Sequence, residues 1–429
     1  MFCNQCEQAA GGTGCVDFGV CGKDEDVQSL QETLLYGLKG MAAYAHHARR
    51  LGKVDEAVDA FTEEALFATM TNVNFDVPTL LELVLECGKQ NLRVMQMLDQ
   101  AHVGRFGKPV VKTVAMGTQA QPGILVTGHD LLDLETLLKQ CEGTDVLVYT
   151  HGEMLPAHMY PKLAAHPNLA GHFGGAWQLQ KNEFEAFGGA ILATTNCILE
   201  PKKSYADRVF TNRVTAVPGG TRLRTDDFSA VLKRARELGP LPLRSGEPIP
   251  VGFHHSVILD AAPAILEAVG KGEITRFFVI GGCDGAEPGR NYYSEYAKNT
   301  PSTSFVLTLG CGKFRIMGHD YGTLLGLPRL LDMGQCNDAY GAIQVAVGLA
   351  NALGCGVNDL PLNIVLSWFE QKAVAVLLTL LHLGVKGIKV GPAAPAFISP
   401  NVFKILQDTF DLQLIGKDAK ADLARDLKG

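Results

Sequence analysis

This 429-residue sequence lacks a long hydrophobic run. Its longest largely apolar stretch, 373–381, is far shorter than the roughly 20 residues needed to span a bilayer, so we expect no transmembrane helix. A strong charge of one sign is also missing, because 38 Lys and Arg face 45 Asp and Glu and the pI is about 6.0. This mild balance indicates neither a nucleic-acid partner nor an anionic membrane surface as partner.

We expect no secretory leader, since Cys3 lies two residues after Met1. Internal repeats and low-complexity tracts are absent as well. Its eleven cysteines are an odd number, which argues against a framework built only from disulfides. Thiolates kept reduced for metal binding agree better with this count, and we therefore expect a cytoplasmic protein.

What the sequence does contain is a cluster of cysteines at its start: Cys3, Cys6, Cys15 and Cys21. The run MFCNQCEQAAGGTGCVDFGVCGK forms one C-x-x-C pair and brings two more cysteines back across a glycine-rich loop. A C-x-x-C pair alone also occurs in zinc ribbons and thioredoxin-like sites. Four cysteines this close, among small residues that leave backbone N–H groups free for sulfur, favour an iron–sulfur cluster over structural zinc.

The pattern of hydrophobicity changes near residue 115. Before it, apolar residues recur at helical spacing and predict helices over 27–51, over 55–70 and from Pro78 toward Met97. Beyond residue 112, short apolar runs alternate with helical stretches, which is typical of βαβ units and parallel sheets. The predicted strands are 124–127, 146–149, 190–194, 251–254, 277–280, 305–309, 364–367 and 387–390. We interpret 244–250 as an irregular segment that precedes a strand.

These patterns predict an α/β protein with three domains. Residues 1–115 form a small helical domain that carries the cysteine-rich loop. Residues 116–260 and 261–429 form two doubly wound, Rossmann-like domains with parallel sheets.

Residues with metal-binding side chains follow several of the predicted strands. Ligands collect beyond the carboxyl ends of parallel strands, so these positions test for a site. The residues found there are His129, Glu153, Cys197, Cys283, Cys311 and Glu370. Cys336 lies in the glycine-containing turn MGQCND. Soft sulfur ligands suit iron–sulfide cores, whereas nitrogen and oxygen donors suit harder, more open iron sites. This mixed set predicts a redox catalyst rather than a simple electron carrier.

Other residues of the same types have simpler interpretations. A lone cysteine after a buried strand is usually a small core residue, which is the simpler interpretation of each strand-end cysteine. We interpret Cys87, Cys141 and Cys355 as core residues, because they lie in helical or helix-end contexts. The glycine-rich run GHFGGAW at 171–177 lacks the strand and helix context of a nucleotide loop.

Some polar residues remain open to two interpretations. His151 and His158 flank Glu153 and are either ligands or residues that cap a helix or orient Glu153. The pair at 254–255 either lines the site or is structural. Lys372, within the apolar run WFEQKAVAV, is expected to have a buried role.

Seven motifs together resemble the hybrid cluster protein family, also called prismane proteins or hydroxylamine reductases. They are the N-terminal cysteine run, YTHGEMLPAH, TTNC, GGCDG, LGCGKFRI, GQCNDAY and LSWFEQKAV. The resemblance extends over nearly the whole chain, with the motifs in the family's order.

The resemblance implies two metal centres. A 4Fe–4S cluster would be held by Cys3, Cys6, Cys15 and Cys21. A hybrid iron–sulfur–oxygen cluster at the domain junction would be held by His129, Glu153, Cys197, Cys283, Cys311, Cys336 and Glu370. Within the family pattern, Cys283 matches a cysteine that can carry a persulfide, and Lys372 matches a lysine at the open side of the cluster.

The resemblance also implies an activity, the reduction of hydroxylamine to ammonia and water with two electrons and two protons; nitric oxide reduction is the other candidate. Protons would come from Glu370, Lys372, Glu153 or His129. Electrons would come from an external protein, a ferredoxin or an NADH-dependent reductase.

Two other functions stay open. One is a nitric oxide sensor or protein-nitrosylation role in nitrosative stress. The other is carbon monoxide dehydrogenase-like chemistry, against which the carboxylate ligands argue because they do not suit nickel.

The helical region after Cys21 is shorter than in the family's larger members. The missing helices would cover part of the catalytic domains, so we expect a second subunit to cover that surface in a homo-oligomer, most simply a dimer.

Overall fold

The computed structural model describes residues 1–428, and the chain divides into two compact units. The first contains Met1–Ala101 together with the chain from Cys355 onward, and the second contains His102–Gly354. Among the described residues, no helix has both the length and the apolar character needed to cross a bilayer.

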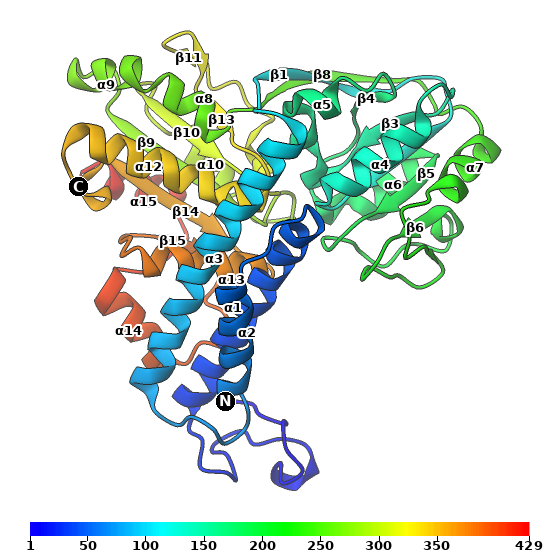
Figure 1. Ribbon diagram of the computed structural model, residues 1–429. Helices are drawn as coiled ribbons and strands as arrows, with labels where there is room; N and C mark the ends of the chain where they lie inside the picture. The colour runs from blue at the N-terminus through cyan, green and yellow to red at the C-terminus, as the bar shows by residue number, and fades with distance from the viewer. Residues whose placement is uncertain (429) are drawn as a thin grey trace. The chain divides into compact units, whose positions relative to one another are not determined.

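Long helices dominate the first unit (Figure 1). They are α1 (Glu25–Arg50), α2 (Glu56–Ala68), α3 (Val77–Phe106), which continues into the second unit, α13 (Gln371–His382), α14 (Pro400–Phe410) and α15 (Ala419–Asp426). Aspartates begin the first two helices, because Asp24 accepts the N–H of Val27 at 2.8 Å and Asp55 accepts that of Ala57 at 3.0 Å. The three helices predicted before residue 115 are thus observed.

Glycines let the helices of the first unit approach closely. In α1, a side chain at Gly40 would overlap the carbonyl oxygen of Gln371, and in α3 one at Gly88 would overlap that of Leu378. Both helices therefore pack directly on the backbone of α13, which lies beside α1 in Figure 1. The parallel strands β14 (Leu362–Ser367), β15 (Lys389–Gly391) and β16 (Gln413–Leu414) complete this unit, with the short turns η1 (Ala10–Gly12) and η6 (Val357–Asp359).

An eight-stranded sheet forms one half of the second unit, in the order β7-β6-β5-β2-β3-β4-β1-β8. Its strands are β1 (Lys112–Thr118), β2 (Gly123–Thr127), β3 (Leu147–Thr150), β4 (Leu169–His172), β5 (Ala190–Ala193), β6 (Val209–Thr211), β7 (Thr221–Arg222) and β8 (Arg244–Val251). All neighbouring pairs are parallel except β1 with β8.

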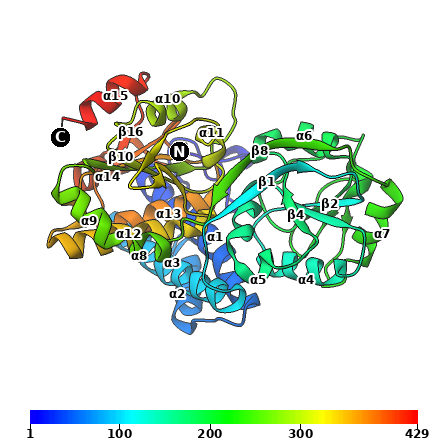
Figure 2. The ribbon, with the colours of Figure 1, turned by 90° about the horizontal axis from the view of Figure 1, so that it is seen from above.

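The direction of this sheet reverses between β2 and β5. From β2 the chain moves through β3 to β4 on one side, and from β5 it moves through β6 to β7 on the other. Figure 2 shows α4 (Leu131–Cys141) and α5 (Pro161–Ala164) on one face and α6 (Gln180–Phe187) on the other, with α7 (Ser229–Leu238) at the far end. Such a reversal opens a crevice beyond the carboxyl ends of the two strands.

The other half of the second unit contains the parallel strands β9 (Arg276–Gly282), β10 (Ser304–Thr308) and β13 (Leu330–Asp332), with β10 between the other two. Its remaining elements are α8 (His255–Asp260), α9 (Ala262–Gly270), α10 (Tyr292–Lys298), α11 (Lys313–Ile316), α12 (Ala339–Leu353) and the hairpin of β11 (Thr323–Leu324) and β12 (Leu327–Pro328). Short 3₁₀ turns carry several loops: η2 (Gly152–Met159), η3 (Trp177–Leu179), η4 (Ala206–Arg208) and η5 (Cys336–Asp338).

The predicted α/β class, with parallel sheets and a helical N-terminal region, is confirmed. One strand prediction is wrong: residues 244–250, expected to be irregular, form most of β8, and the expected strand at 251–254 does not continue past Val251. Two prolines lie within β8, and an edge strand tolerates them because one side of it is unpaired. The domain limits near residues 115 and 260 stay a prediction.

Candidate metal centres

The N-terminal cysteine loop is closed by backbone hydrogen bonds between two of its cysteines. The N–H of Cys3 donates to the carbonyl of Cys15 at 3.0 Å, and the N–H of Cys15 returns to Cys3 at 2.8 Å. Between them Gly12 has a φ of +71°, which residues with side chains rarely adopt. Cys6 lies within the closed loop, where its carbonyl accepts the N–H of Ala9 at 3.3 Å.

Backbone N–H groups already point at sulfur in this loop. Those of Ala10 and then Val20 lower the pKa of the Cys15 thiol, because they stabilise its thiolate form. Cys21 lies against the turn between α2 and α3, with its Sγ 3.9 Å from the carbonyl oxygen of Thr71. The loop thus offers four thiols, one with amide N–H donors in place, which suits an iron–sulfur cluster.

A second group of side chains gathers in the second unit where the large sheet reverses. His129 follows β2 and Thr195 follows β5, and His129 Nδ1 lies 2.8 Å from Thr195 Oγ1. The intervening Gly128 has a φ of +102°, and a side chain there would overlap Thr194 and Thr195. The threonine hydroxyl therefore fixes the imidazole ring and leaves Nε2 facing the site.

Glu153, in η2 after β3, connects this imidazole to the strands of the other half. Its Oε2 lies 3.1 Å from His129 Nε2, and the carboxylate accepts the N–H groups of Cys311 at 3.1 Å and Cys336 at 2.8 Å. The ligand atoms of His129, Glu153 and Cys336 all lie within 4.8 Å of one another. A buried imidazole, a buried carboxylate and a half-buried thiol at this spacing can share one metal.

Two further cysteines meet beside this trio. Hydrogen bonding to the Cys197 thiol, followed by burial and the negative charge of Glu153, raises the pKa of the Cys311 thiol well above its usual value. Cys197 itself has a φ of +63°, in the left-handed region. Non-glycine residues there carry about 1–2 kcal/mol of strain, which is stored most often at functional sites.

Cys283 follows β9 and is held by its backbone. Its carbonyl oxygen accepts Trp177 Nε1 at 3.1 Å and Gln178 Nε2 at 3.2 Å. Two residues after Gln178, Gln180 donates to the carbonyl of Cys197. The segment 177–180 thus positions two of the candidate cysteines.

The remaining two candidates, Glu370 and Lys372, belong to the first unit. Glu370 caps α13, and its carboxylate accepts the N–H of Lys372 at 3.2 Å. The Lys372 side chain is buried, with Nζ 3.9 Å from Glu370 Oε1 and 5.8 Å from the centroid of the Tyr44 ring. The expected buried role of Lys372 agrees with this position.

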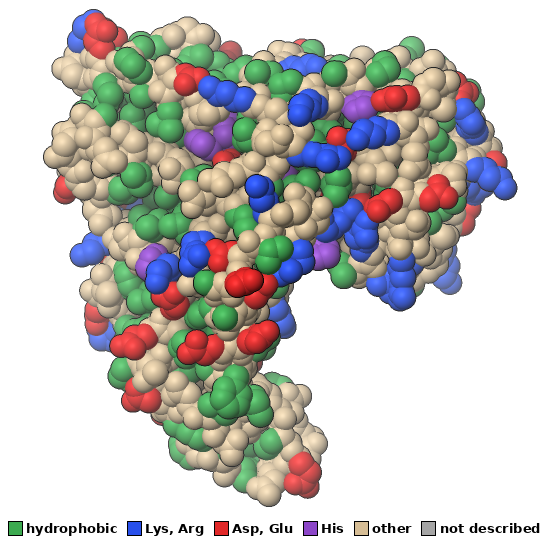
Figure 3. Space-filling view, viewed as in Figure 1, with side chains coloured by type: hydrophobic (Ala, Val, Ile, Leu, Met, Phe, Trp, Pro, Cys, Tyr) green, Lys and Arg blue, Asp and Glu red, His purple; other side chains and the backbone are tan. Residues whose placement is uncertain are grey.

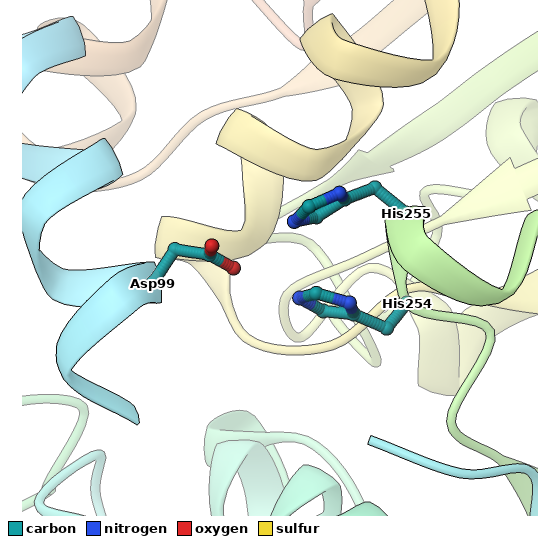
Figure 4. A group of neighbouring side chains, drawn as sticks. All are labelled: Asp99, His254 and His255. Atoms are coloured by element: carbon teal, nitrogen blue, oxygen red, sulfur yellow. The ribbon is translucent and has the colours of Figure 1, made fainter. Parts of the chain in front are cut away.

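The histidines left open by the sequence have structural partners. His151 Nε2 lies 2.9 Å from Glu183 Oε2, and burial lowers the pKa of His158 to about 4. His254 and His255 begin α8, their ring centroids are 3.9 Å apart, and His254 Nδ1 accepts the N–H of Ser256 at 3.3 Å (Figure 4). Neither His254 nor His255 follows a strand end of the sheet reversal.

The cysteines interpreted as core residues include two that are fully buried. Burial raises the pKa of Cys87 and of Cys141 to about 12, so both stay protonated thiols at neutral pH. Cys355 is half-buried.

Sequence reasoning missed the residues that position the ligands. Besides Thr195, Trp177 and Gln180, these include Gln335, whose Nε2 donates to the carbonyls of His129 at 3.2 Å and Glu153 at 2.8 Å. The one available signal was adjacency, since Thr195 and Gln335 each lie within two residues of a candidate cysteine.

A sequence model of the Prismane/CO dehydrogenase family matches residues 1–83 and 76–424. The chain belongs to the Prismane/CO dehydrogenase family. A protein named hydroxylamine reductase from Moorella thermoacetica is 58% identical over 415 residues, which is 97% of each chain. One of the same name from Thermotoga petrophila is 47% identical and covers 98% of each.

A longer prismane relative, the hydroxylamine reductase of Geobacter sulfurreducens, is 41% identical over 548 aligned positions that cover 99% of this chain and 100% of that protein. The two stretches matched by the family model meet at residues 76–83, where α3 begins. The Geobacter relative is thus longer than this chain, and the match to the family model is divided at the start of α3.

Solved structures agree on the fold. Carbon monoxide dehydrogenase IV from Carboxydothermus hydrogenoformans superposes with a TM-score of 0.79 over 100% of this chain and 92% of that one, at 15% identity. Family membership and the two thiol-rich groups together indicate iron–sulfur clusters as the metal groups of this prismane protein. The donors fit such groups, because sulfur ligands dominate both and the second group adds nitrogen and oxygen.

Proposed function

We propose that this protein is an iron–sulfur oxidoreductase that reduces hydroxylamine to ammonia and water. The reaction consumes two electrons and two protons and breaks the N–O bond. The relatives named hydroxylamine reductase, which match nearly the whole chain, support this proposal.

The observation that carries the proposal is the meeting of donors of unlike hardness where the sheet reverses. His129, Glu153 and Cys336 share one small volume, and Cys197 and Cys311 lie beside them. A pure electron carrier needs only thiolates. Imidazole and carboxylate donors permit an open coordination position for a small nitrogenous molecule.

We propose two clusters with separate roles. A 4Fe–4S cluster on Cys3, Cys6, Cys15 and Cys21 would accept electrons from an external donor protein. A hybrid iron–sulfur–oxygen cluster on His129, Glu153, Cys197, Cys283, Cys311, Cys336 and Glu370 would supply electrons and a Lewis-acidic iron when bound. The chain's own residues then hold the ligands and move protons: the Thr195 hydroxyl fixes the His129 ring, and two backbone N–H groups hold Glu153.

Proton delivery is assigned to Glu370 and Lys372. An ammonium group 3.9 Å from a carboxylate at the start of a helix can exchange a proton with it as hydroxide leaves. Replacing Glu370 by Gln should lower turnover at least tenfold while leaving the electron paramagnetic resonance signal of the N-terminal cluster unchanged. Full activity of that variant would contradict the assignment.

The activity is tested anaerobically on the purified full-length protein with a chemical reductant and hydroxylamine. Ammonia formed far in excess of protein supports catalysis. Binding of nitric oxide in equal amount, without turnover of either nitrogen compound, would instead support a sensor in nitrosative stress. Iron and labile sulfide in excess of one 4Fe–4S cluster per chain is the result expected for two clusters, and iron for one cluster alone would overturn the hybrid site.

The assembly and location of the protein are also proposals. Because the chain is shorter than the Geobacter relative and would leave part of the catalytic domains uncovered, we propose a homodimer, which light scattering after size-exclusion chromatography would test at micromolar concentration. The odd count of eleven cysteines favours a cytoplasmic location. The electron donor proposed from the family resemblance is a ferredoxin or an NADH-dependent reductase.

A further inference from the structure

Lys23 is a buried cation in the N-terminal unit. It is the only Lys or Arg among the first 38 residues, and its side chain is 0% exposed. The visible face around the N-terminal loop, at the bottom of Figure 3, shows hydrophobic and acidic side chains but no basic ones. Besides the N-terminal ammonium group, which pairs with Glu25 at 3.2 Å, the side-chain cation of residues 1–38 is therefore buried.

The hydrogen-bond partners of Lys23 are neutral. Its Nζ donates to Oε1 of Gln28 at 2.7 Å and to Oε1 of Gln31 at 3.0 Å. Within residues 1–428, no carboxylate forms an ion pair with this ammonium group. Amide oxygens satisfy two of its three N–H donors but carry no formal charge, and the Glu32 carboxylate interacts with Lys23 without forming an ion pair.

The cysteine loop packs against this lysine. Lys23 follows Cys21 by two residues, and its carbonyl accepts the N–H of Gly19 at 2.8 Å. A side chain at Gly19 would come within 3.2 Å of the Lys23 Cβ, so the loop lies directly on the lysine. The positive charge of Lys23 also acts on the Cys15 sulfur.

The same network reaches the turn that borders Cys21. Gln31 uses its Nε2 to donate to the carbonyls of Asn74 at 3.3 Å and Met70 at 3.5 Å. The Cys21 sulfur contacts the carbonyl of Thr71 in that turn. Lys23 is thus held between the end of the cysteine loop, at Gly19 and Cys21, and the network that reaches the α2–α3 turn.

We infer that Lys23 is the built-in counter-charge of the N-terminal cluster and sets its reduction potential. This inference rests on the 4Fe–4S assignment of the proposed function but not on the substrate. A cluster with four thiolates is anionic, and taking up one electron from the donor adds one negative charge with no proton. A fixed buried cation favours the more negative, reduced form, because net charge near a cluster tunes its potential.

The test is a potentiometric titration of the full-length, anaerobically purified protein, followed by the electron paramagnetic resonance signal of the reduced cluster. Lys23→Met should lower the ratio of reduced to oxidised cluster at a fixed potential about tenfold, a shift of ~59 mV for a one-electron couple. Lys23→Arg keeps the charge and should restore the wild-type value. Lys39→Met, which removes an exposed cation from the same region, is the matched control.

A second variant keeps the lysine. Gln28→Glu places a carboxylate at the 2.7 Å contact, neutralises Nζ in place and should shift the potential in the same direction. If the Lys23→Met protein does not bind iron, the potential of Gln28→Glu alone tests the inference. Wild-type potentials in Gln28→Glu and in any loaded Lys23→Met protein would overturn the inference. These potentials can be measured even in a protein that does not turn over hydroxylamine. The proposed activity and the proposed role of Lys23 can therefore be disproved independently.

Discussion

Thr195 is the residue whose contact most directly fixes a candidate ligand. Its hydroxyl lies 2.8 Å from His129 Nδ1 in a buried environment, so the ring cannot rotate without losing this hydrogen bond. Partners of this kind are worth about 10–100-fold in metal affinity or activity. Thr195→Val should lower hydroxylamine turnover by that factor.

The measurement is the rate of ammonia formation, with iron content determined in parallel. Thr136→Val, which removes a hydroxyl bonded only to its own helix, is the control and should keep the wild-type rate. Equal rates of ammonia formation in the two variants would show that Thr195 does not position His129.

His158 makes stability depend on pH. Burial, and then the charge of Lys112, lower the pKa of His158 from 6.5 to about 4. Between these values the unfolded chain binds a proton that the native protein excludes, so the stabilising effect present above pH 6.5 is lost as the pH falls toward 4. This group contributes up to about 3 kcal/mol over that window.

Denaturant titrations at several pH values test this dependence. His158→Gln should flatten the fall of the unfolding free energy with decreasing pH, whereas the same change at the exposed His46 should leave the slope as it is. Parallel pH profiles for wild type and His158→Gln would contradict the expectation.

At the scale of elements, the packing of α3 on α13 depends on Gly88. A side chain there would overlap the carbonyl of Leu378, which belongs to the backbone and cannot rotate away. Overpacking of this kind typically costs about 1–3 kcal/mol. Gly88→Ala should therefore destabilise the protein by at least this amount.

Gly104 in the same helix offers a matched control. No atom lies within 4 Å of the position that its side chain would take. Gly104→Ala should be neutral or stabilise the helix by up to about 1 kcal/mol. The denaturant midpoints of both variants measure this difference in stability. Equal midpoints would show that a side chain at Gly88 does not destabilise the packing of α3 on α13.

Helices and strands could be predicted where the signal lies in the local sequence. The helices of 25–106 were predictable because their apolar stripes and capping aspartates are local signals. The strands β2, β3, β5, β9, β10 and β14 were predictable for the same reason, whereas the ligand roles of the residues that follow them stay a prediction. β8 was not, because its pairing with β1 depends on residues more than 120 positions away and its prolines suggest a loop.

The residues that position the candidate ligands could not be predicted from the sequence, for a related reason. Trp177 and Gln180 act on backbone carbonyls of Cys283 and Cys197, and any donor of the right length could do so. Their residue types carry no chemical signature, and only the folded chain brings them to the strand ends. Likewise, the sequence showed Lys23 beside Cys21 but not that its partners are two glutamines.

At the scale of the whole molecule, the chain beyond Cys355 completes the unit that begins at Met1. Asn91 in α3 donates to the carbonyl of Ala375 at 3.1 Å and to Thr379 at 2.9 Å, and Ser399 bonds Asp26 at 2.6 Å. A protein truncated after Gly354 loses α13 and these partners. Its α1 and α3 should then exchange amide hydrogens far faster than in the full chain, while β2, β3 and β5 keep their protection.

Hydrogen–deuterium exchange with mass spectrometry resolves this difference by segment. Slow exchange of α1 and α3 in the truncated chain would show that the N-terminal helices are stable without their C-terminal partner.

The shared packing of the two chain ends has a consequence for biosynthesis. While the ribosome is still translating the middle of the message, the nascent N-terminal helices have no α13 to cover their glycine-lined faces, and about 250 further residues must emerge first. The N-terminal helices can therefore complete their packing only after α13 has been translated and has left the ribosome.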